Sequence, residues 1–147
     1  MRKFEIVSKY AHLNPVIPQR ATSRSAGYDL SSIEDVTVEP NQVVLVKTGL
    51  KVTMPEDEAL FVFPRSSLAL KKGLMMSNSV GIIDADYYNN ENNEGHIMIP
   101  LINVKNEAVM VARGERIAQG VFLTYGILTQ DEPQSVARVG GFGSSGH

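Results

Sequence analysis

The sequence predicts an all-β domain of the sandwich or barrel class. Three observations support this prediction: short β-prone segments dominate the chain, turn-forming segments separate them at intervals of about ten residues, and only one segment is typical of a helix. The chain has 147 residues and a hydrophobic content of 43%, which suits one globular domain rather than two.

The predicted strands are short runs of β-branched, aromatic and other apolar residues, and they span 42–48, 50–54, 59–63, 96–102 and 120–123. Turn-forming residues separate them at 39–41, 54–57 and 111–115. A short helix is expected over residues 67–72, because a serine stands at its start, lysines at its end and Gly73 behind it. The polar tract 89–95 is expected to form an exposed hairpin loop, since it contains no apolar residue to anchor it.

Composition and charge argue against several classes of function. The chain has no cysteine and three histidines, so it can form neither a disulfide nor a thiolate nucleophile, and a structural zinc site is not expected. The net charge of −2 provides no basic field for a nucleic-acid polymer, and Lys71 and Lys72 are better explained as the solvated end of the short helix. No run of about 18 apolar residues occurs, so we expect no membrane segment and a soluble, intracellular protein of the cytoplasm.

The segment 78–87 carries the strongest indication of a functional site. Its apolar, strand-like run ends abruptly in two carboxylates and a phenol, Asp84, Asp86 and Tyr87. Carboxylates are seldom buried without a partner, so these side chains should lie at a strand end and face water, a cation or a ligand. The sequence therefore predicts a binding or catalytic site here rather than a piece of core.

Four other segments carry weaker signals. Residues 64–67 (Pro-Arg-Ser-Ser) could hold a phosphate at the start of the helix, or could be an N-cap serine beside a surface arginine, and the residues alone leave both possibilities open. Residues 26–30 and 113–119 are, singly, ordinary turns that enter strands. The tail 140–147 contains a G-x-G-x-x-G pattern without the strand and helix of a dinucleotide site, and Phe142 is typical of an arm that orders over a ligand.

Taken together and in this order, five segments resemble the five motifs of the trimeric dUTPase family, the deoxyuridine triphosphate pyrophosphatases. They are Ala-Gly-Tyr-Asp-Leu at 26–30, Pro-Arg-Ser-Ser-Leu at 64–68, Gly-Ile-Ile-Asp-Ala-Asp-Tyr at 81–87, Arg-Gly-Glu-Arg-Ile-Ala-Gln at 113–119, and the arginine and glycine-rich stretch at 138–146. The resemblance spans nearly the whole chain. It implies a distorted β-barrel or jelly-roll subunit over 1–137, a flexible glycine-rich arm over 138–147, and a homotrimer whose three active sites are shared between subunits.

The activity implied by the resemblance is hydrolysis of dUTP to dUMP and pyrophosphate, which limits uracil incorporation into DNA and supplies dUMP. Asn78 and nearby backbone groups would contact the uracil edge in a pocket formed by Asn78, Gly81, Ile82, Ile83 and Met98. Tyr87 would stack under the deoxyribose and exclude a 2′-hydroxyl. Rejection of ribose requires that the added hydroxyl meet a hard wall rather than a merely apolar one.

The chemistry implied by the resemblance begins with Asp84, which would orient and deprotonate the water that attacks the α-phosphorus in line. Arg65 would be the second catalytic residue, and the phosphates would also be held by Ser66, Ser67 and Gln119. Magnesium keeps most of its waters, so Mg²⁺ would bridge the phosphate oxygens and contact Asp29 only through a bound water. A lid from a neighbouring chain would close with Arg138, Phe142, Gly143, Ser144 and Ser145.

Two features depart from the commoner pattern of the family. The tract 89–94 looks like an insertion after Tyr87, and Arg138 stands one residue closer to its glycine pair than in many members. Asp86 is expected to pair with Arg116 or another arginine and to fix the turn rather than to act in catalysis.

Two alternative functions fit the same residues. A dCTP deaminase of the same fold would need a glutamate as its acid and base, for which Glu91 and Glu94 are available. A non-catalytic regulatory protein could bind a deoxynucleotide in the same pocket. Retention of Asp84, Arg65 and Phe142 favours a hydrolase, although it leaves room for an added regulatory role.

Overall fold

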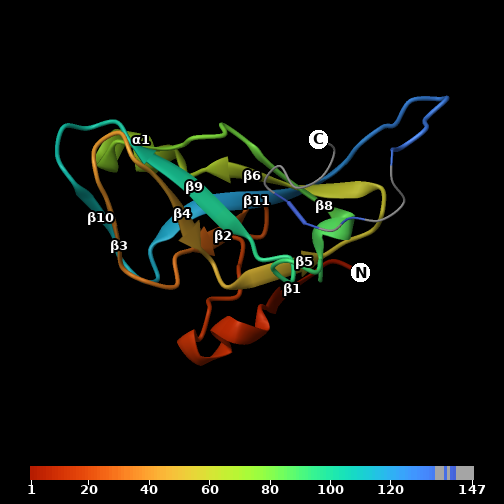
Figure 1. Cartoon of the computed structure of the whole chain (residues 1–147), viewed down its shortest axis with the longest axis horizontal. Helices are drawn as coiled ribbons and strands as arrows, with labels where there is room; N and C mark the ends of the chain where they lie inside the picture. The colour runs from red at the N-terminus through yellow and green to blue at the C-terminus, as the bar shows by residue number, and fades with distance from the viewer. Residues whose placement is uncertain (135–137, 139, 142–147) are drawn as a thin grey trace.

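The structure, a computed structural model, describes residues 1–134, 138, 140 and 141. This part of the chain is built from antiparallel strands with one short α-helix and two 3₁₀ turns (Figure 1). In chain order the elements are β1 (Lys3–Ile6), η1 (Ser8–Leu13), β2 (Tyr28–Ser31), β3 (Val36–Val38), β4 (Val43–Lys47), β5 (Leu50–Thr53), β6 (Glu58–Pro64), α1 (Ser66–Lys72), β7 (Leu74–Met76), β8 (Gly81–Asp84), η2 (Ala85–Tyr87), β9 (Met98–Asn103), β10 (Val109–Val111) and β11 (Arg116–Thr124).

The strands form a jelly-roll arrangement of small antiparallel sheets. A four-stranded sheet has the order β2-β11-β6-β8, a three-stranded sheet has the order β4-β9-β7, and β1-β5 and β10-β3 form two-stranded pairs. The all-β prediction is confirmed, and each of the five predicted strands overlaps an observed one. Of the two expected architectures, the jelly roll fits, because the described strands are divided among separate sheets and form no closed barrel.

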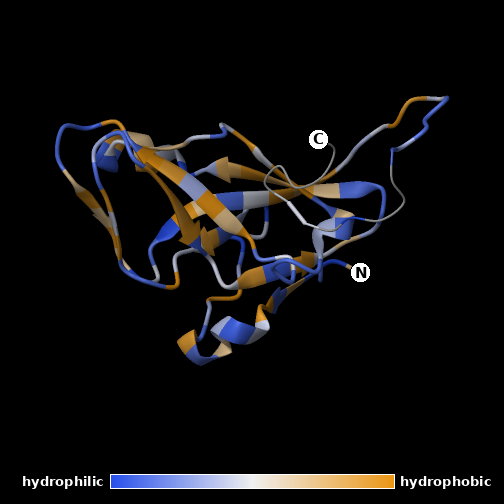
Figure 2. Cartoon of the chain, in the orientation of Figure 1, coloured by the Kyte–Doolittle hydropathy of each residue, from blue (hydrophilic) through white to orange (hydrophobic). Residues whose placement is uncertain are grey.

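The core lies between these sheets and follows from the alternation of side chains along the strands. Leu60 and Val62 of β6 and Ile99 and Leu101 of β9 are all fully buried, and the members of each pair are two positions apart, so they share one face of their strand. The apolar segments coincide with the strands in Figure 2. Burying one such aliphatic side chain contributes about 1.5–3 kcal/mol, so this cluster provides most of the stability that holds the sheets together.

Strand β6 is central to the site because it is paired on both sides. Its partner β11 runs beside it from Glu58 to Pro64, and β8 pairs with its first half, where Ala59 lies opposite Asp84. Arg65 directly follows the last residue of the strand. At about 3.3 Å per residue, the six steps from Ala59 to Arg65 span about 20 Å, so the Asp84 and Arg65 positions lie at opposite ends of β6.

The helix begins one residue earlier than expected and without a serine cap. The prediction placed a serine at the N-cap of 67–72, whereas α1 starts at Ser66 and its N-cap is Arg65, whose side chain makes no capping hydrogen bond within the described residues. The predicted end is confirmed: Gly73 adopts a left-handed conformation (φ 65°) and donates its N–H to the Ala69 carbonyl at 3.0 Å.

The tract 89–95 is not the exposed loop that was expected. Asn90 and Gly95 are buried, and the loop folds on itself through backbone hydrogen bonds from Asn89 to Glu94 (2.9 Å) and from Glu94 to Asn90 (3.0 Å). The Asn90 and Asn93 side chains supply hydrogen bonds within the loop in place of apolar anchors, and Glu94 bonds outward to Ser8 and Lys51, so composition alone misjudged the burial of the loop. In the described part of the chain, no helix has the length and apolarity needed to span a bilayer.

Candidate active site

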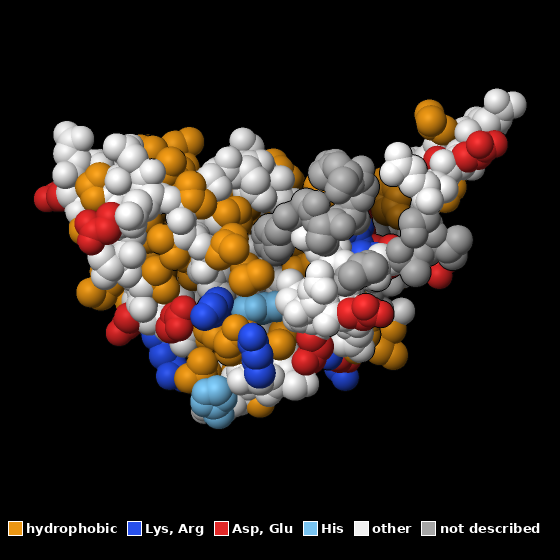
Figure 3. All heavy atoms as spheres, in the orientation of Figure 1, with side chains coloured by type: hydrophobic (Ala, Val, Ile, Leu, Met, Phe, Trp, Pro, Cys, Tyr) orange, Lys and Arg blue, Asp and Glu red, His pale blue; other side chains and the backbone are white. Residues whose placement is uncertain are grey.

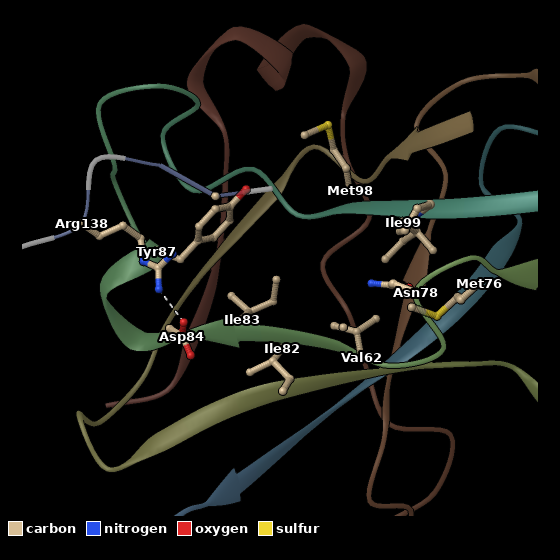
Figure 4. Close-up of a pocket in the computed structure, with 13 residues that line it drawn as sticks. Val62, Met76, Asn78, Ile82, Ile83, Asp84, Tyr87, Met98, Ile99 and Arg138 are labelled. Atoms are coloured by element: carbon tan, nitrogen blue, oxygen red, sulfur yellow. Dashed lines mark hydrogen bonds and ion pairs between the residues drawn. The ribbon is translucent and has the colours of Figure 1, made fainter. Parts of the chain in front are cut away.

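A cavity of about 190 Å³ lies along β8, between this strand and the start of β9 (Figure 4). All five residues expected to form the pyrimidine pocket line it, namely Asn78, Gly81, Ile82, Ile83 and Met98, and they are joined there by Asp84, Tyr87 and Arg138. Sequence reasoning missed its floor, which includes Val62, Met76 and Ile99. The inward alternation of β6 and β9 was the signal that could have identified Val62 and Ile99.

The cavity is mainly apolar and has few polar groups, which suits a flat ring that is recognised by a small number of hydrogen bonds. Gly81 keeps it open, because a Cβ at this position would lie 3.3 Å from Cβ of Val62 and 3.5 Å from Nδ2 of Asn78. The Asn78 amide points into the cavity from the turn before β8 (Figure 4). The cavity therefore combines one side-chain amide, that of Asn78, with mainly apolar walls.

Asp84 ends β8 at the mouth of the cavity, and about half of its side chain is exposed. Arg138 contacts it: Nη2 donates to Oδ2 of Asp84 at 2.5 Å, and Nε donates to Oδ1 of Asp86 at 2.7 Å. The hydrogen bond to Asp86, together with the charges of both carboxylates, raises the pKa of Arg138 against the opposing effect of burial. Asp86 therefore has an arginine partner, as expected, but the partner is Arg138 and not Arg116.

Tyr87 forms one wall of the cavity and is almost completely buried. Its hydroxyl donates to the backbone carbonyl of His96 at 2.8 Å and accepts a hydrogen bond from Nδ2 of Asn93 at 2.8 Å. Burial raises the pKa of the Tyr87 phenol, so the ring is neutral and its hydroxyl proton remains available to the carbonyl. Gly141 packs against the ring edge, since a Cβ there would lie 2.6 Å from Cε1 of Tyr87.

A second group of candidate residues lies at the other end of β6. Gln119 of β11 is paired with Phe63 on one side and with Asp29 of β2 on the other. The Asp29 carboxylate lies 3.8 Å from Nε of Arg65 and 3.4 Å from Nη1 of Arg116. One carboxylate between two guanidinium groups leaves an excess of positive charge, which favours an anion.

The phosphate-binding candidates border their own hollow, which Arg65 and Ser67 share with Lys71 and Lys72 of the same helix and with Arg116. Ser66 lies beside them in the first turn of the helix and is exposed. No described residue lines both this hollow and the cavity along β8. One chain therefore does not bring Asp84 and Arg65 together.

Two sets of candidate residues are not placed in either the cavity along β8 or the hollow beside α1. Phe142, Gly143, Ser144 and Ser145 lie outside the described residues. The glutamates considered for a deaminase do not line the cavity along β8: Glu91 is exposed, and Glu94 accepts hydrogen bonds from Lys51 (2.7 Å) and Ser8 (2.9 Å). The Lys51 contact lowers the pKa of Glu94, so this carboxylate is ionised and occupied in a structural ion pair.

Comparison with known proteins agrees with these observations. A family model described as dUTPase matches residues 14–146. The deoxyuridine 5′-triphosphate nucleotidohydrolase of Lactococcus lactis subsp. lactis is 46% identical over 147 residues, which cover 99% of this chain and 98% of that protein. A crystal structure of dUTPase from Streptococcus mutans superposes with a TM-score of 0.82 at 44% identity and covers 86% of this chain and 98% of its own.

A more distant neighbour shares the fold. A mutant dUTPase from phage phi11 of S. aureus, whose structure reveals the coordination of a structural Mg(II) ion, superposes with a TM-score of 0.73 at 22% identity, covering 92% of this chain and 98% of its own. The extent of the family match and the identity to the Lactococcus enzyme decide the assignment. The chain belongs to the dUTPase family and is a dUTP diphosphatase, which hydrolyses dUTP to dUMP and pyrophosphate.

Proposed function

We propose that the cavity along β8 binds the deoxyuridine part of dUTP and that Asp84 activates the attacking water. The position of Asp84 carries this proposal: it is the only carboxylate among the described residues that line the apolar cavity, and it stands at the mouth where a nucleotide's phosphates would leave the pocket. Asp84 takes the proton of the water as the water attacks the α-phosphorus. A carboxylate is a modest base, so most of the acceleration comes from alignment and from neutralisation of phosphate charge.

Recognition of the base is proposed for Asn78 and for the backbone around Gly81, Ile82, Ile83 and Met98. Uracil presents two carbonyl oxygens and one ring N–H, and an amide together with strand-edge backbone groups can satisfy both kinds of atom. The apolar floor contacts the faces of the ring. Tyr87 closes the sugar end of the pocket, where its buried ring excludes a 2′-hydroxyl.

The phosphates are assigned to Arg65, Ser66, Ser67 and Gln119. A guanidinium group and two hydroxyls at the start of a helix are suited to phosphate oxygens, and Lys71 adds positive charge, whereas the charge of Lys72 is balanced by Glu115 at 2.7 Å. Asp29 lies beside Arg65 and Arg116 and would contact Mg²⁺ through a water, since magnesium binds through few protein carboxylates and through substrate phosphates. When bound, Mg²⁺ supplies charge neutralisation at the phosphate oxygens.

Because Asp84 and Arg65 lie at opposite ends of β6, a complete site requires more than one chain, and we propose the homotrimer. Two observations support assembly. Val43, Ile102 and Met75 are aligned across β4, β9 and β7, and Val43 and Met75 are exposed at about half of their surface. Figure 3 shows other hydrophobic side chains that reach the surface of one face.

The second observation concerns the segment 125–134, which is exposed throughout and extends away from the sheets (Figure 1). It carries Ile127 and Leu128, each about three-quarters exposed, which water disfavours in a monomer. This segment leads into the predicted arm, so it supports the proposal that the arm reaches a neighbouring subunit and closes over its site. Arg138 would then exchange its carboxylate partners for phosphate oxygens. The cytoplasm stays the predicted location.

Substrate assays test the proposed roles. Purified protein with Mg²⁺ should release pyrophosphate rapidly from dUTP but not from dCTP, dTTP or UTP, whereas ammonia from dCTP would reveal a deaminase. Asp84→Asn should lower kcat roughly a hundredfold or more and still bind a non-hydrolysable dUTP analogue. Asp57→Asn is the matched control, because Asp57 is an exposed carboxylate that lies outside the cavity. If Asp84→Asn turned over like wild type, Asp84 could not be the base.

A separate assay tests the metal. Asp29→Asn should raise the Mg²⁺ concentration needed for half-maximal turnover, and an excess of EDTA should stop pyrophosphate release from the wild-type enzyme. An unchanged Mg²⁺ dependence in the variant would remove Asp29 from the proposed contact.

A further inference from the structure

The loop 89–95, which we call the asparagine loop, is a folded unit in direct contact with the active-site wall. Asn90 lies at its centre: Nδ2 donates to the backbone carbonyl of Tyr87 at 2.8 Å, and Oδ1 accepts from the backbone N–H groups of Asn92 (3.0 Å) and Asn93 (3.1 Å). The loop is therefore built around the backbone of Tyr87 and does not merely follow it in sequence.

Asn93 connects this loop to the aromatic ring of Tyr87. Its Nδ2 donates to the phenolic oxygen at 2.8 Å, while its Oδ1 accepts from Nδ2 of Asn90 at 2.8 Å and from the backbone N–H of Gly95 at 3.0 Å. These two donors fix which side of the amide faces Tyr87, because an amide turned by 180° would place nitrogen against both N–H groups. The donor to the phenol is thus oriented by the loop itself.

The phenolic oxygen is held from two directions. It receives a hydrogen bond from Asn93, which lies in the asparagine loop, and gives one to the carbonyl of His96, the residue that directly follows the loop. His96 is itself anchored, because its Nε2 accepts the backbone N–H of Gly49 at 3.0 Å. A ring fixed at its hydroxyl and buried on its sides cannot tilt away from the pocket without breaking a hydrogen bond.

Two further contacts make the loop rigid at its far end. Gly95 has φ of 91°, and a Cβ there would lie 2.9 Å from the backbone oxygen of Tyr87, so only glycine permits this close approach. Glu94 accepts a hydrogen bond from Nζ of Lys51 at 2.7 Å, which ties the loop to β5. The loop is therefore attached both to the wall of the pocket and to a core strand.

We propose that Asn93 is a positioning residue for sugar selection: the asparagine loop holds the Tyr87 ring in place through the Asn93 amide, so that the 2′-hydroxyl of UTP meets a wall that cannot yield. This inference rests on the proposed contact between Tyr87 and the sugar. An apolar pocket that can relax discriminates poorly against one added hydroxyl, so rejection depends on the stiffness of the wall and not only on its presence. The inserted loop provides that stiffness.

The test compares kcat/KM for dUTP with kcat/KM for UTP in Asn93→Ala. The ratio should fall about tenfold, the effect of one hydrogen bond on a discriminating wall, mainly because UTP becomes a better substrate. The kcat for dUTP should change less than threefold. Asn92→Ala is the matched control, since Asn92 is an exposed member of the same loop that joins the network above through its backbone N–H, and it should keep the wild-type ratio.

Tyr87→Phe provides the second arm, because it removes the hydroxyl and leaves the contacts of Asn93 with Asn90 and Gly95 intact. It should lower the ratio at least as far as Asn93→Ala, and adding Asn93→Ala in this background should cause no further fall, whereas a merely structural role would give additive effects. An unchanged ratio in a folded Asn93→Ala or in Tyr87→Phe would overturn the proposal. Tyr87→Leu distinguishes failure of the Asn93 proposal from failure of the proposed role of Tyr87. If Tyr87→Leu also keeps the wild-type ratio, Tyr87 does not select the sugar.

Discussion

The separation of Asp84 from Arg65 along β6 predicts that two inactive variants restore each other's activity when mixed. Asp84→Asn removes the proposed base, and Arg65→Ala removes a charge-assisted phosphate contact, so each homotrimer should retain about 1% of wild-type turnover or less. In a mixed trimer, a site that takes Asp84 from one chain and Arg65 from its neighbour can contain both wild-type residues.

The expected recovery follows from random assembly. In an equal mixture, the chain that supplies Asp84 carries the Arg65→Ala change with a probability of about one half, and the neighbour that supplies Arg65 carries the Asp84→Asn change with the same probability. About one quarter of the sites are then intact. The refolded mixture as a whole should show about 25% of wild-type turnover, a gain of about 25-fold or more over either variant alone.

The assay unfolds the two purified variants together, refolds them, and measures pyrophosphate release from dUTP, with each variant refolded alone as the baseline. A control mixes wild type with the double variant: shared sites predict about one quarter of full activity, whereas sites complete within one chain predict about one half. If the mixed variants stayed at baseline although mass spectrometry showed mixed trimers, the argument from the two ends of β6 would be refuted.

Three further predictions concern the arm, a buried histidine and a glycine. Deleting residues 138–147 should leave a trimer of normal size in gel filtration with at least tenfold lower turnover, and loss of folding would contradict the division at residue 138. Burial lowers the pKa of His96 from 6.5 to about 4, so the folded state favours the neutral imidazole. The free energy of unfolding should therefore be highest above pH 6.5 and fall by about 3 kcal/mol toward pH 4. Urea titrations of His96→Gln should show a weaker dependence of this free energy on pH. Gly27→Ala should lower kcat about tenfold while the melting temperature changes little, because a Cβ at residue 27 would overlap Oε1 of Gln119 and lie 3.1 Å from its Cβ; wild-type kcat would show that Gln119 need not occupy its observed position.

The elements that sequence analysis located are those with strong local signals. The runs that became β4, β6 and β9 are continuous apolar stretches bounded by turn residues, and Gly73 marks the end of α1 as expected. The short strands β1, β3 and β10 were not predicted, because runs of three or four residues interrupted by charges or turns carry no distinct periodicity. They become strands through pairing with β5 and with each other, which is a tertiary effect.

Most residues that line the cavity along β8 were predictable from the sequence, but their geometry was not. The motif 81–87 placed Asp84 at a strand end beside an apolar pocket, and the structure agrees. The sequence predicted an arginine as the partner of Asp86 but did not identify Arg138, because the contact joins positions 52 residues apart. The contacts of Asn93 were missed because asparagine-rich tracts are usually solvated, and only the folded loop shows that these amides satisfy one another.

Strand β6 also has a consequence for how the enzyme behaves on dilution. Pairing with β8 and β11 keeps β6 extended, so in the proposed homotrimer a solitary chain carries both Asp84 and Arg65 but does not place them in one site. Specific activity therefore becomes a measure of association: it should decline once the protein concentration drops below the dissociation constant of the oligomer, even while circular dichroism reports unaltered secondary structure.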